Sequence, residues 1–353
     1  MIVIGILLLL LIFLRLWLYF SKQEQSSYAH LEKWFCFLAF GGIICLAAFR
    51  GASVGADTPG YIADYFDVSE MDFQEIAYRY KGYELFFWIA KLFTIVGAPI
   101  WIWFAFIETI YISAIGRLIF KYSSDKLYSV ILFITIGLFS FSLAGLKQVL
   151  AMALILHSYL EFVSHRYYLC VILLAVSYFI HPVVFIFIPV FFLYPLKNNN
   201  ALFVVSITAF LLIFMAMNMR VATYFVTLQK DEHFETYLLL DKSYSSTTLF
   251  YYLSLLIIGL LFFRNYFLKS NLAKLELGML IFACLLQYMA SKSPNFFRLA
   301  YLYTPFYLIY LPNVFDHTKG KGVEILKVAT LIFTIVYFLY VSRDFVYRFA
   351  TNI

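Results

Sequence analysis

Apolar runs of about 16 to 22 residues recur along the whole chain, and they constrain its fold more than any other feature. Each run is long enough for one helix to cross the roughly 30 Å of hydrocarbon in a bilayer. Only helices and closed barrels satisfy their backbone hydrogen bonds there, and these runs lack the alternation of barrel strands. The sequence therefore predicts an all-α polytopic membrane protein with about 10–13 transmembrane helices, forming a single integral membrane domain over residues 1–353.

The composition excludes a soluble globule, because 64% of the 353 residues are hydrophobic and only 13% are charged. The formal net charge of +6 is spread among the connections without a block of Lys or Arg, which argues against nucleic-acid binding. The sequence contains no Walker-type phosphate loop, no zinc-type spacing of Cys and His, and no serine nucleophile elbow. We therefore predict no cofactor, no metal and no nucleic-acid partner.

Positive residues in short connections indicate which face of the membrane is cytoplasmic. This assignment puts the two longest polar connections, 50–81 and 220–246, together on the outer face. Loops of that length in a compact membrane protein are commonly functional. The positive clusters lie at 15–33, 264–274 and 316–327.

Two regions of the chain do not fit a simple alternation of crossings. If every apolar stretch crosses once, Arg117 and its basic neighbours fall outside, so we expect a stretch within 82–119 not to span. The run 167–195 would be about 43 Å of helix, too long for one upright span. His181-Pro182 lies at its middle, and proline breaks or kinks a helix. We therefore predict at least one broken or re-entrant helix pair, of the kind that lines a cavity.

An apolar segment ends abruptly at residues 49–61, where charge, glycine and proline follow at once. Arg50 is expected at the lipid headgroup level, where its guanidinium can grip a phosphate from two directions. Gly51 and Gly55 allow positive φ and close approach of a ligand. Asp57-Thr58-Pro59 is typical of a helix start with Asp57 or Thr58 as cap, and such termini favour anions. Any polytopic protein also has an arginine and glycines where a helix meets water, so the local pattern alone leaves both interpretations open.

Ionisable residues within apolar segments are costly and are therefore functional candidates. Lys91 and Glu108 lie at similar depths on either side of the turn at Gly97-Ala98-Pro99, and we predict a structural ion pair between them. Glu84 lies near the start of the apolar segment that follows the connection 50–81. Its carboxylate there could take a proton from a sugar hydroxyl as a general base.

Three further charged or titratable positions each have two interpretations. Lys147, followed by Gln148, either snorkels to a nearby surface or meets an anionic ligand. His181 is either a satisfied core residue or a reactive one. Arg298 lies at a second outer boundary, where it either anchors a helix or holds one phosphate of a diphosphate while Arg50 holds the other.

These positions carry a resemblance to a known family. Phe49-Arg50-Gly51, Val54-Gly55-x-Asp57-Thr58 and Tyr61, with Gly82-Tyr83-Glu84 at the next apolar segment, resemble the signature of the EpsG-type family. Lys147-Gln148-Val-Leu-Ala151 resembles that family's Arg-Gln-x-x-Ala, with the charge kept and the bidentate fork lost. His181 matches a histidine of the family. Its members resemble Wzy O-antigen polymerases.

The resemblance implies a bacterial inner-membrane glycosyltransferase that assembles O-antigen of lipopolysaccharide, capsule or exopolysaccharide on the outer face. Its partners would be undecaprenyl-diphosphate-linked donor and acceptor repeat units, the bilayer and a chain-length regulator. Such an enzyme must stabilise charge on the leaving diphosphate and deprotonate an acceptor hydroxyl. We assign the diphosphates to Arg50, Lys147 and Arg298 with Thr58 and Gln148, the base to Asp57, Glu84 or His181 in that order, and the sugars to Tyr61 and Tyr83.

Two alternatives from other classes stay open. A transporter or flippase of lipid-linked oligosaccharide would share the cationic residues and the broken helices. A polymerase-null strain still displays single repeat units, whereas a flippase-null strain displays none. A membrane O-acyltransferase using His181 would need a cytoplasmic acyl-donor site, for which the sequence carries no motif.

Overall fold

The computed structural model describes residues 2–20, 25–216, 246–270, 272–290, 296–318, 320–343 and 346–350. Within these ranges the regular structure is helical, and no sheet is formed beyond one isolated bridge between Arg50 and Phe349. Five of the described helices are long and apolar enough to cross a membrane, and six shorter apolar helices accompany them. The predicted all-α fold with several membrane-length helices is confirmed.

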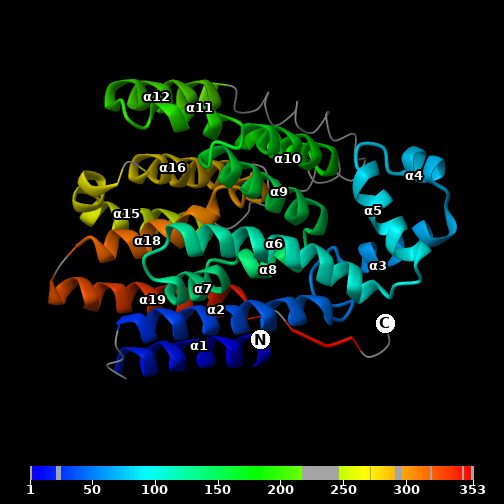
Figure 1. The fold of residues 1–353 in the computed structure, drawn as a ribbon, viewed down its shortest axis with the longest axis horizontal. Coiled ribbons are helices and arrows are strands. Elements are labelled where there is room, and N and C mark those ends of the chain that lie inside the picture. The colour runs from blue at the N-terminus through cyan, green and yellow to red at the C-terminus, as the bar shows by residue number, and fades with distance from the viewer. Residues whose placement is uncertain are drawn as a thin grey trace. The chain divides into compact units, whose positions relative to one another are not determined.

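The chain forms two compact units (Figure 1). Unit 1 comprises Met1–His181 and Leu331–Ile353, and unit 2 comprises Pro182–Thr330. The prediction of a single integral membrane domain stays a prediction. Unit 1 contains α1 (Ile2–Phe20), α2 (Gln25–Ala48), α3 (Thr58–Glu70), α4 (Phe73–Arg79), α5 (Glu84–Ile95), α6 (Ile100–Tyr122), α7 (Lys126–Thr135), α8 (Leu138–Ser142), α9 (Leu146–Val163) and α10 (Tyr167–Ile180). Unit 2 contains η1 (Pro182–Phe187), α11 (Pro189–Leu196), α12 (Asn200–Ala216), α15 (Thr247–Lys269), α16 (Ala273–Ala290), α17 (Phe296–Ala300), η2 (Thr304–Phe306) and α18 (Tyr307–Asp316), and α19 (Lys321–Val341) crosses the boundary.

Three ion pairs gather charged residues from several helices of unit 1 at one end, which we call the Arg15 end. The Arg15 guanidinium on α1 forms a bidentate pair with Asp125, with N–O distances of 2.6 and 2.7 Å. The adjoining Lys126 ammonium lies 3.2 Å from a carboxylate oxygen of Glu32 on α2. At the end of α6, Arg117 pairs with Glu161 of α9 at 2.7 Å. The ends of five helices therefore meet on one face, as charges excluded from a bilayer would.

The short helix α5 explains why a simple alternation of crossings failed. It has 12 residues and is therefore about 18 Å long, too short to cross the hydrocarbon alone. The chain turns at Gly97, whose φ is +67°, and α6 begins at Ile100, directly after this turn. Helix α6 is long and apolar enough to cross, and its C-terminal part brings Arg117 and Lys121 to the Arg15 end, beside Glu161 and Ser164. The break that was expected within 82–119 is present at Gly97, whereas the expectation that one stretch there does not span stays a prediction.

A second predicted break is also present. Helix α10 ends at Ile180, His181 takes extended backbone with φ −157° and ψ 113°, and a 3₁₀ turn begins at Pro182. Proline cannot donate to the preceding turn, so the helical ladder stops there. A break that was not predicted separates α7 from α8, where Gly137 adopts φ +93°. Left-handed backbone of this kind is tolerated best by glycine.

Unit 2 buries its polar side chains in hydrogen bonds between helices. The Glu276 carboxylate on α16 accepts a hydrogen bond from the Tyr266 hydroxyl at 2.8 Å, and that hydroxyl accepts one from Asn313 at 3.1 Å. The Tyr307 hydroxyl donates to the backbone carbonyl of Tyr252 at 2.8 Å. Buried polar groups without such partners are expensive, so these bonds specify how α15, α16 and α18 pack.

Candidate functional site

The predicted helix start at residues 57–59 is the first part of the site. Helix α3 begins at Thr58 with Asp57 as its N-cap residue and Pro59 in the first turn, but the Asp57 side chain makes no capping hydrogen bond. The loop before it turns at Gly55, whose φ is +88°. A Cβ at Gly55 would collide with the backbone carbonyl of Leu143. The glycine is therefore required both by its conformation and by the close approach of the chain after α8.

Arg50 points into the protein. Its side chain is 0% exposed, one terminal nitrogen donates to the carbonyl of Ala47 at 2.6 Å, and Nε lies 3.4 Å from the Thr58 hydroxyl. The guanidinium carbon lies 4.0 Å from the centre of the Phe104 ring. Arg50 was predicted at a lipid boundary, and it does follow directly after α2, but in this conformation it presents no surface to a ligand. Its predicted phosphate contact stays a prediction.

Glu108 and Ser142 complete this buried group, which we call the Arg50 node (Arg50, Thr58, Phe104, Glu108 and Ser142). The Ser142 hydroxyl donates to the Glu108 carboxylate at 3.0 Å, and Glu108 acts electrostatically on Arg50. Burial lowers the pKa of the Arg50 guanidinium to about 10, while Glu108 raises it, so Arg50 remains a cation at neutral pH. One nitrogen of Arg50 and one oxygen of Glu108 have no hydrogen-bond partner among the described residues.

The predicted ion pair between Lys91 and Glu108 is wrong. The Lys91 ammonium donates to the backbone carbonyl of Ser69 at 3.0 Å, and Glu108 is turned toward Ser142 and Arg50 instead. The two residues lie on faces of α5 and α6 that point to different neighbours.

Lys147 lies in a second group of residues, at the end of unit 1 opposite the Arg15 end. It is the second residue of α9. Its ammonium lies 4.2 Å from the ring centre of Tyr83, 5.5 Å from that of Phe87 and 5.9 Å from that of Tyr61. The backbone amide of Lys147 donates to the Tyr61 hydroxyl at 3.4 Å. A half-buried cation thus lies among three aromatic rings at a helix N-terminus.

His181 reaches the same group through Tyr83. The two rings meet edge to face, with centres 5.4 Å apart and planes 64° apart. His181 is buried at the C-cap of α10, where its backbone amide donates to the carbonyl of Ser177 at 3.0 Å. The broken helix end therefore fixes the position of the imidazole beside Tyr83.

Asp64 on α3 adds a carboxylate that the sequence did not single out. One of its oxygens accepts a hydrogen bond from the Tyr80 hydroxyl at 2.9 Å, and the Tyr80 ring stacks on Phe87 with centres 3.7 Å apart. Burial raises the pKa of Asp64, against the hydrogen bond from Tyr80 and the charge of Lys147, which lower it. We call the whole group the Lys147 cluster; its members are Tyr61, Asp64, Tyr80, Tyr83, Phe87, Lys147 and His181.

The structure thus brings four of the predicted site residues together, namely Tyr61, Tyr83, Lys147 and His181. Glu84 follows Tyr83 at the start of α5, half-buried, with no ion pair to a described residue. Gln148 is buried within α9. Arg298 belongs to α17 of unit 2, so its predicted cooperation with Arg50 stays a prediction. Of the second outer loop, 220–245 lies outside the described residues, and so does the Ser293-Pro294-Asn295 approach to Arg298.

Asp64 could have been found from helical spacing. Tyr61, Tyr65 and Val68 are buried on one face of α3, and Asp64 lies between the first two on that face. An acidic residue within an apolar stripe is unusual in a surface helix. Tyr80 and Phe87 carried no comparable signal, because their contact depends on how α4 folds back on α5.

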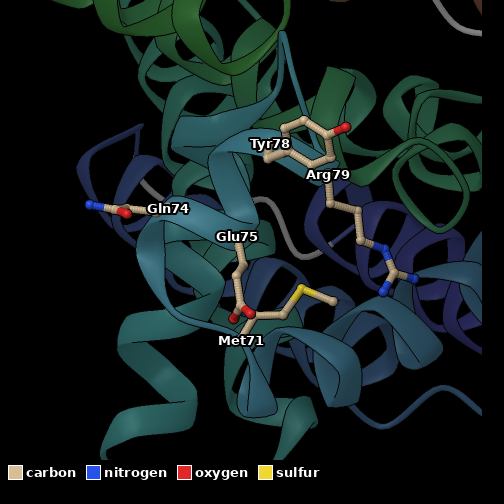
Figure 2. Close-up of a pocket in the computed structure, with 5 residues that line it drawn as sticks. All are labelled: Met71, Gln74, Glu75, Tyr78 and Arg79. Atoms are coloured by element: carbon tan, nitrogen blue, oxygen red, sulfur yellow. The ribbon is translucent and has the colours of Figure 1, made fainter.

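A shallow depression lies on α4 and on Met71 just before it, close in sequence to Tyr80 of the cluster. It has a volume of about 430 Å³ and is lined by Met71, Gln74, Glu75, Tyr78 and Arg79. In Figure 2 the side chains of Gln74 and Arg79 extend away from it in opposite directions. Glu75 is held by the Asp72 amide in a capping box, and Arg79 pairs with Asp67 at 2.5 Å. These polar groups are already engaged, so the depression offers a ligand little.

Metal binding has no support within the part of the chain that the structure describes, where no three His, Cys, Asp or Glu side chains gather closely enough to hold an ion. Comparison with known proteins adds one positive finding. A family model described as the EpsG family matches residues 33–350, a region that contains both the Arg50 node and the Lys147 cluster. No curated protein and no solved structure matches the chain.

Proposed function

The chain belongs to the EpsG family of membrane proteins linked to exopolysaccharide biosynthesis, and we propose that it is a polysaccharide polymerase. In this proposal it transfers a growing glycan from undecaprenyl diphosphate to an acceptor repeat unit, itself linked to a lipid diphosphate. The site is the Lys147 cluster, facing the outer side of a bacterial inner membrane. The product is O-antigen, capsule or exopolysaccharide.

The observation that carries the proposal is the position of Lys147. A cation in the first turn of a helix is repelled by the helix dipole, which costs about 0.3–1 kcal/mol. An anion at the same place would be attracted both by the ammonium and by the positive end of the helix dipole. The leaving diphosphate is such an anion, and its negative charge grows as the glycosidic bond breaks. Fixed positive charge at that point stabilises the transition state more than the ground state.

The aromatic members of the cluster suit the sugar part of the substrate. Tyr83 is half-buried and offers a ring and a hydroxyl beside Lys147. Sugars present apolar C–H faces that stack on rings and hydroxyls that hydrogen-bond to polar tips. Tyr61 is 6% exposed and packs against Phe86 and Trp103. We therefore propose Tyr83 as the sugar contact and Tyr61 as a wall that holds Lys147 in place.

Arg50 has a different role in this proposal. Its guanidinium is enclosed by its own chain, and a lipid headgroup would have to displace the Ala47 carbonyl and the Phe104 ring to reach it. We propose that Arg50 fixes the loop that leads into α3. The diphosphate contact expected from the sequence then falls to Lys147, which meets it as a point charge rather than a bidentate fork.

The decisive experiment is Lys147→Met in a strain that lacks the native gene. Methionine keeps most of the unbranched stem but removes the charge, so the protein should reach the membrane at normal abundance while polymer falls at least about 100-fold. Single repeat units should still be displayed. Lys147→Arg, which keeps the charge, should restore part of the polymer. Normal polymer length with Lys147→Met would refute the assigned site.

A transporter of lipid-linked oligosaccharide is the second candidate, favoured by the helix breaks at Gly137 and His181. Interrupted helices line substrate paths in many transporters. A strain lacking the gene separates the two candidates. Displayed single repeat units indicate a missing polymerase, whereas accumulation of repeat units on the cytoplasmic side with none displayed indicates a missing transporter.

A further inference from the structure

We propose that the carboxylate of Asp64 accepts the proton of the acceptor hydroxyl during glycan transfer, with Tyr80 as the residue that positions it. This assignment rests on the proposed polymerase function. Asp64 takes the place of Asp57, Glu84 and His181 as the proton acceptor, because the Tyr80 hydroxyl fixes its carboxylate within the Lys147 cluster.

The position of Asp64 is set by contacts on two sides. Its own helix is anchored by the buried Tyr61 and Tyr65, which lie three residues before it and one residue after it on the same face of α3. The Tyr80 hydroxyl holds one carboxylate oxygen at 2.9 Å. Tyr80 in turn is held flat against Phe87, which is 1% exposed. Only this one oxygen has a hydrogen-bond partner among the described residues, which leaves the other for an acceptor hydroxyl.

The electrostatic surroundings of Asp64 fit a proton acceptor. Burial raises its pKa, while the Tyr80 hydrogen bond, Lys147 from α9 and Arg79 from α4 lower it, and Asp67 on its own helix raises it. Helix α5, which also packs on α3, directs Lys91 to the carbonyl of Ser69. A base works best when its pKa lies near the working pH, above that of an ordinary aspartate. The pKa of Asp64 is therefore raised above that of an ordinary aspartate, while the positive charge of Lys147 favours its ionised form.

The proposed step balances without any cofactor. The acceptor oxygen forms a bond to the anomeric carbon of the donor glycan as the bond from that carbon to the diphosphate oxygen breaks. The electron pair of the broken bond leaves with the lipid diphosphate, whose charge Lys147 offsets. The acceptor proton passes to the free oxygen of Asp64 and later to water. Lys147 thus serves the leaving diphosphate and Asp64 serves the acceptor hydroxyl, and the two residues lie near each other without forming an ion pair.

The test uses the full-length protein in lipid nanodiscs. The substrate is the lipid-linked repeat unit extracted from a strain that lacks the gene, and undecaprenyl diphosphate alone is the binding probe. Asp64→Asn should lower the rate of polymer formation at least about 100-fold, within the range that a general base contributes. Its affinity for undecaprenyl diphosphate should stay within about twofold of wild type, because Lys147 is untouched. Asp67→Asn is the matched control on the same helix, and it should polymerise normally at pH 8.

A pH profile separates a proton acceptor from a merely structural carboxylate. Activity should fall as the pH drops through the pKa of Asp64, since only the ionised form accepts a proton. Tyr80→Phe keeps the ring on Phe87 but removes the hydrogen bond that lowers this pKa. The acid limb of the profile should therefore move to higher pH in Tyr80→Phe. This readout also decides the matter if Asp64→Asn does not fold.

The outcomes bear on different statements. If wild type forms polymer and Asp64→Asn forms it within about threefold of the wild-type rate, the Asp64 assignment is overturned and the polymerase proposal stands. An unmoved acid limb in Tyr80→Phe overturns the assignment in the same way. If Asp64→Asn loses binding of undecaprenyl diphosphate together with activity, Asp64 shapes the site and does not accept the proton. If wild type itself joins no repeat units, the proposed function fails and this inference fails with it.

Discussion

The Arg50 node and the Lys147 cluster lie at the same end of unit 1, and each is built around one cation. In the node the cation is 0% exposed and its partners are a backbone carbonyl, a ring and a distant carboxylate. In the cluster the cation is half-buried among rings, with a carboxylate nearby that is held by a tyrosine instead. In the first arrangement the cation is fully enclosed by protein, and in the second it is partly exposed.

This difference teaches that a charged residue at a membrane boundary cannot be assigned to a ligand by its sequence position. Arg50 carries the stronger phosphate-binding chemistry of the two, because a guanidinium donates from five N–H groups. It is nevertheless the one enclosed by protein. Substitutions that separate loss of folding from loss of activity are therefore the way to test the comparison.

The largest effect is expected for Arg50→Ala. This change leaves the Ala47 carbonyl and Thr58 without their partner and removes the charge that faces Glu108, so the free energy of unfolding should fall by about 3 kcal/mol or more. Folded yield after detergent extraction and the midpoint of thermal unfolding measure it. Arg79→Ala is the control, since Arg79 is about half exposed and its pair with Asp67 is worth at most about 1 kcal/mol. A stable but inactive Arg50→Ala protein would show that Arg50 acts in ligand binding and not in folding, which would contradict the difference drawn between the node and the cluster.

The next largest effect is expected for Gly55→Ala. An alanine at φ +88° is strained, and its Cβ would press against the Leu143 carbonyl, so stability should fall by about 2 kcal/mol. Gly60→Ala is the matched control within α3, where a Cβ meets nothing within 4 Å. That change should leave stability unchanged or raise it by up to about 1 kcal/mol through helix propensity. Equal unfolding midpoints for the two variants would show that the loop is not clamped to Leu143.

The smallest effect on folding is expected for Tyr83→Leu, on the cluster side of the comparison. Tyr83 is half-buried and makes no side-chain cap to α5, so the unfolding midpoint should hardly move. Loss of the ring beside Lys147 should lower polymer yield about tenfold, the scale of one cation–π contact. Tyr83→Phe, which keeps the ring, should retain most of the yield. A large fall in the midpoint for Tyr83→Leu would make the cluster structural like the node.

Much of the fold could be predicted because its determinants are local. The lengths of the apolar runs indicated helices, and Pro182 and the Gly97-Ala98-Pro99 turn marked breaks that α10 and α5 confirm. The start of α3 at Thr58 followed from Pro59 in the first turn. Each of these features depends on backbone chemistry within a few residues, which a sequence displays directly.

The candidate site was harder to predict from the sequence, because it depends on how each helix is rotated about its own axis. Depth in the membrane suggested that Lys91 and Glu108 meet, but depth does not fix the face of α6 on which Glu108 lies. The same uncertainty hid the inward turn of Arg50. Asp64 was missed for the opposite reason: an aspartate in a polar helix is usually solvated, and only its place between Tyr61 and Tyr65 sets it apart.

The segment 346–350 closes the Arg50 loop from far along the chain. The Gly51 amide donates to the Arg348 carbonyl at 2.8 Å, the Ala350 amide donates to the Phe49 carbonyl at 3.0 Å, and the Tyr347 hydroxyl bonds to the carbonyl of Leu46, 301 residues away. During synthesis the ribosome therefore releases this loop long before its partner exists. Helices can insert one after another through the translocon, but this corner of the protein cannot close before residues 346–350 have been synthesised. Closure of the Arg50 loop would then follow membrane insertion of the helices that precede residue 346.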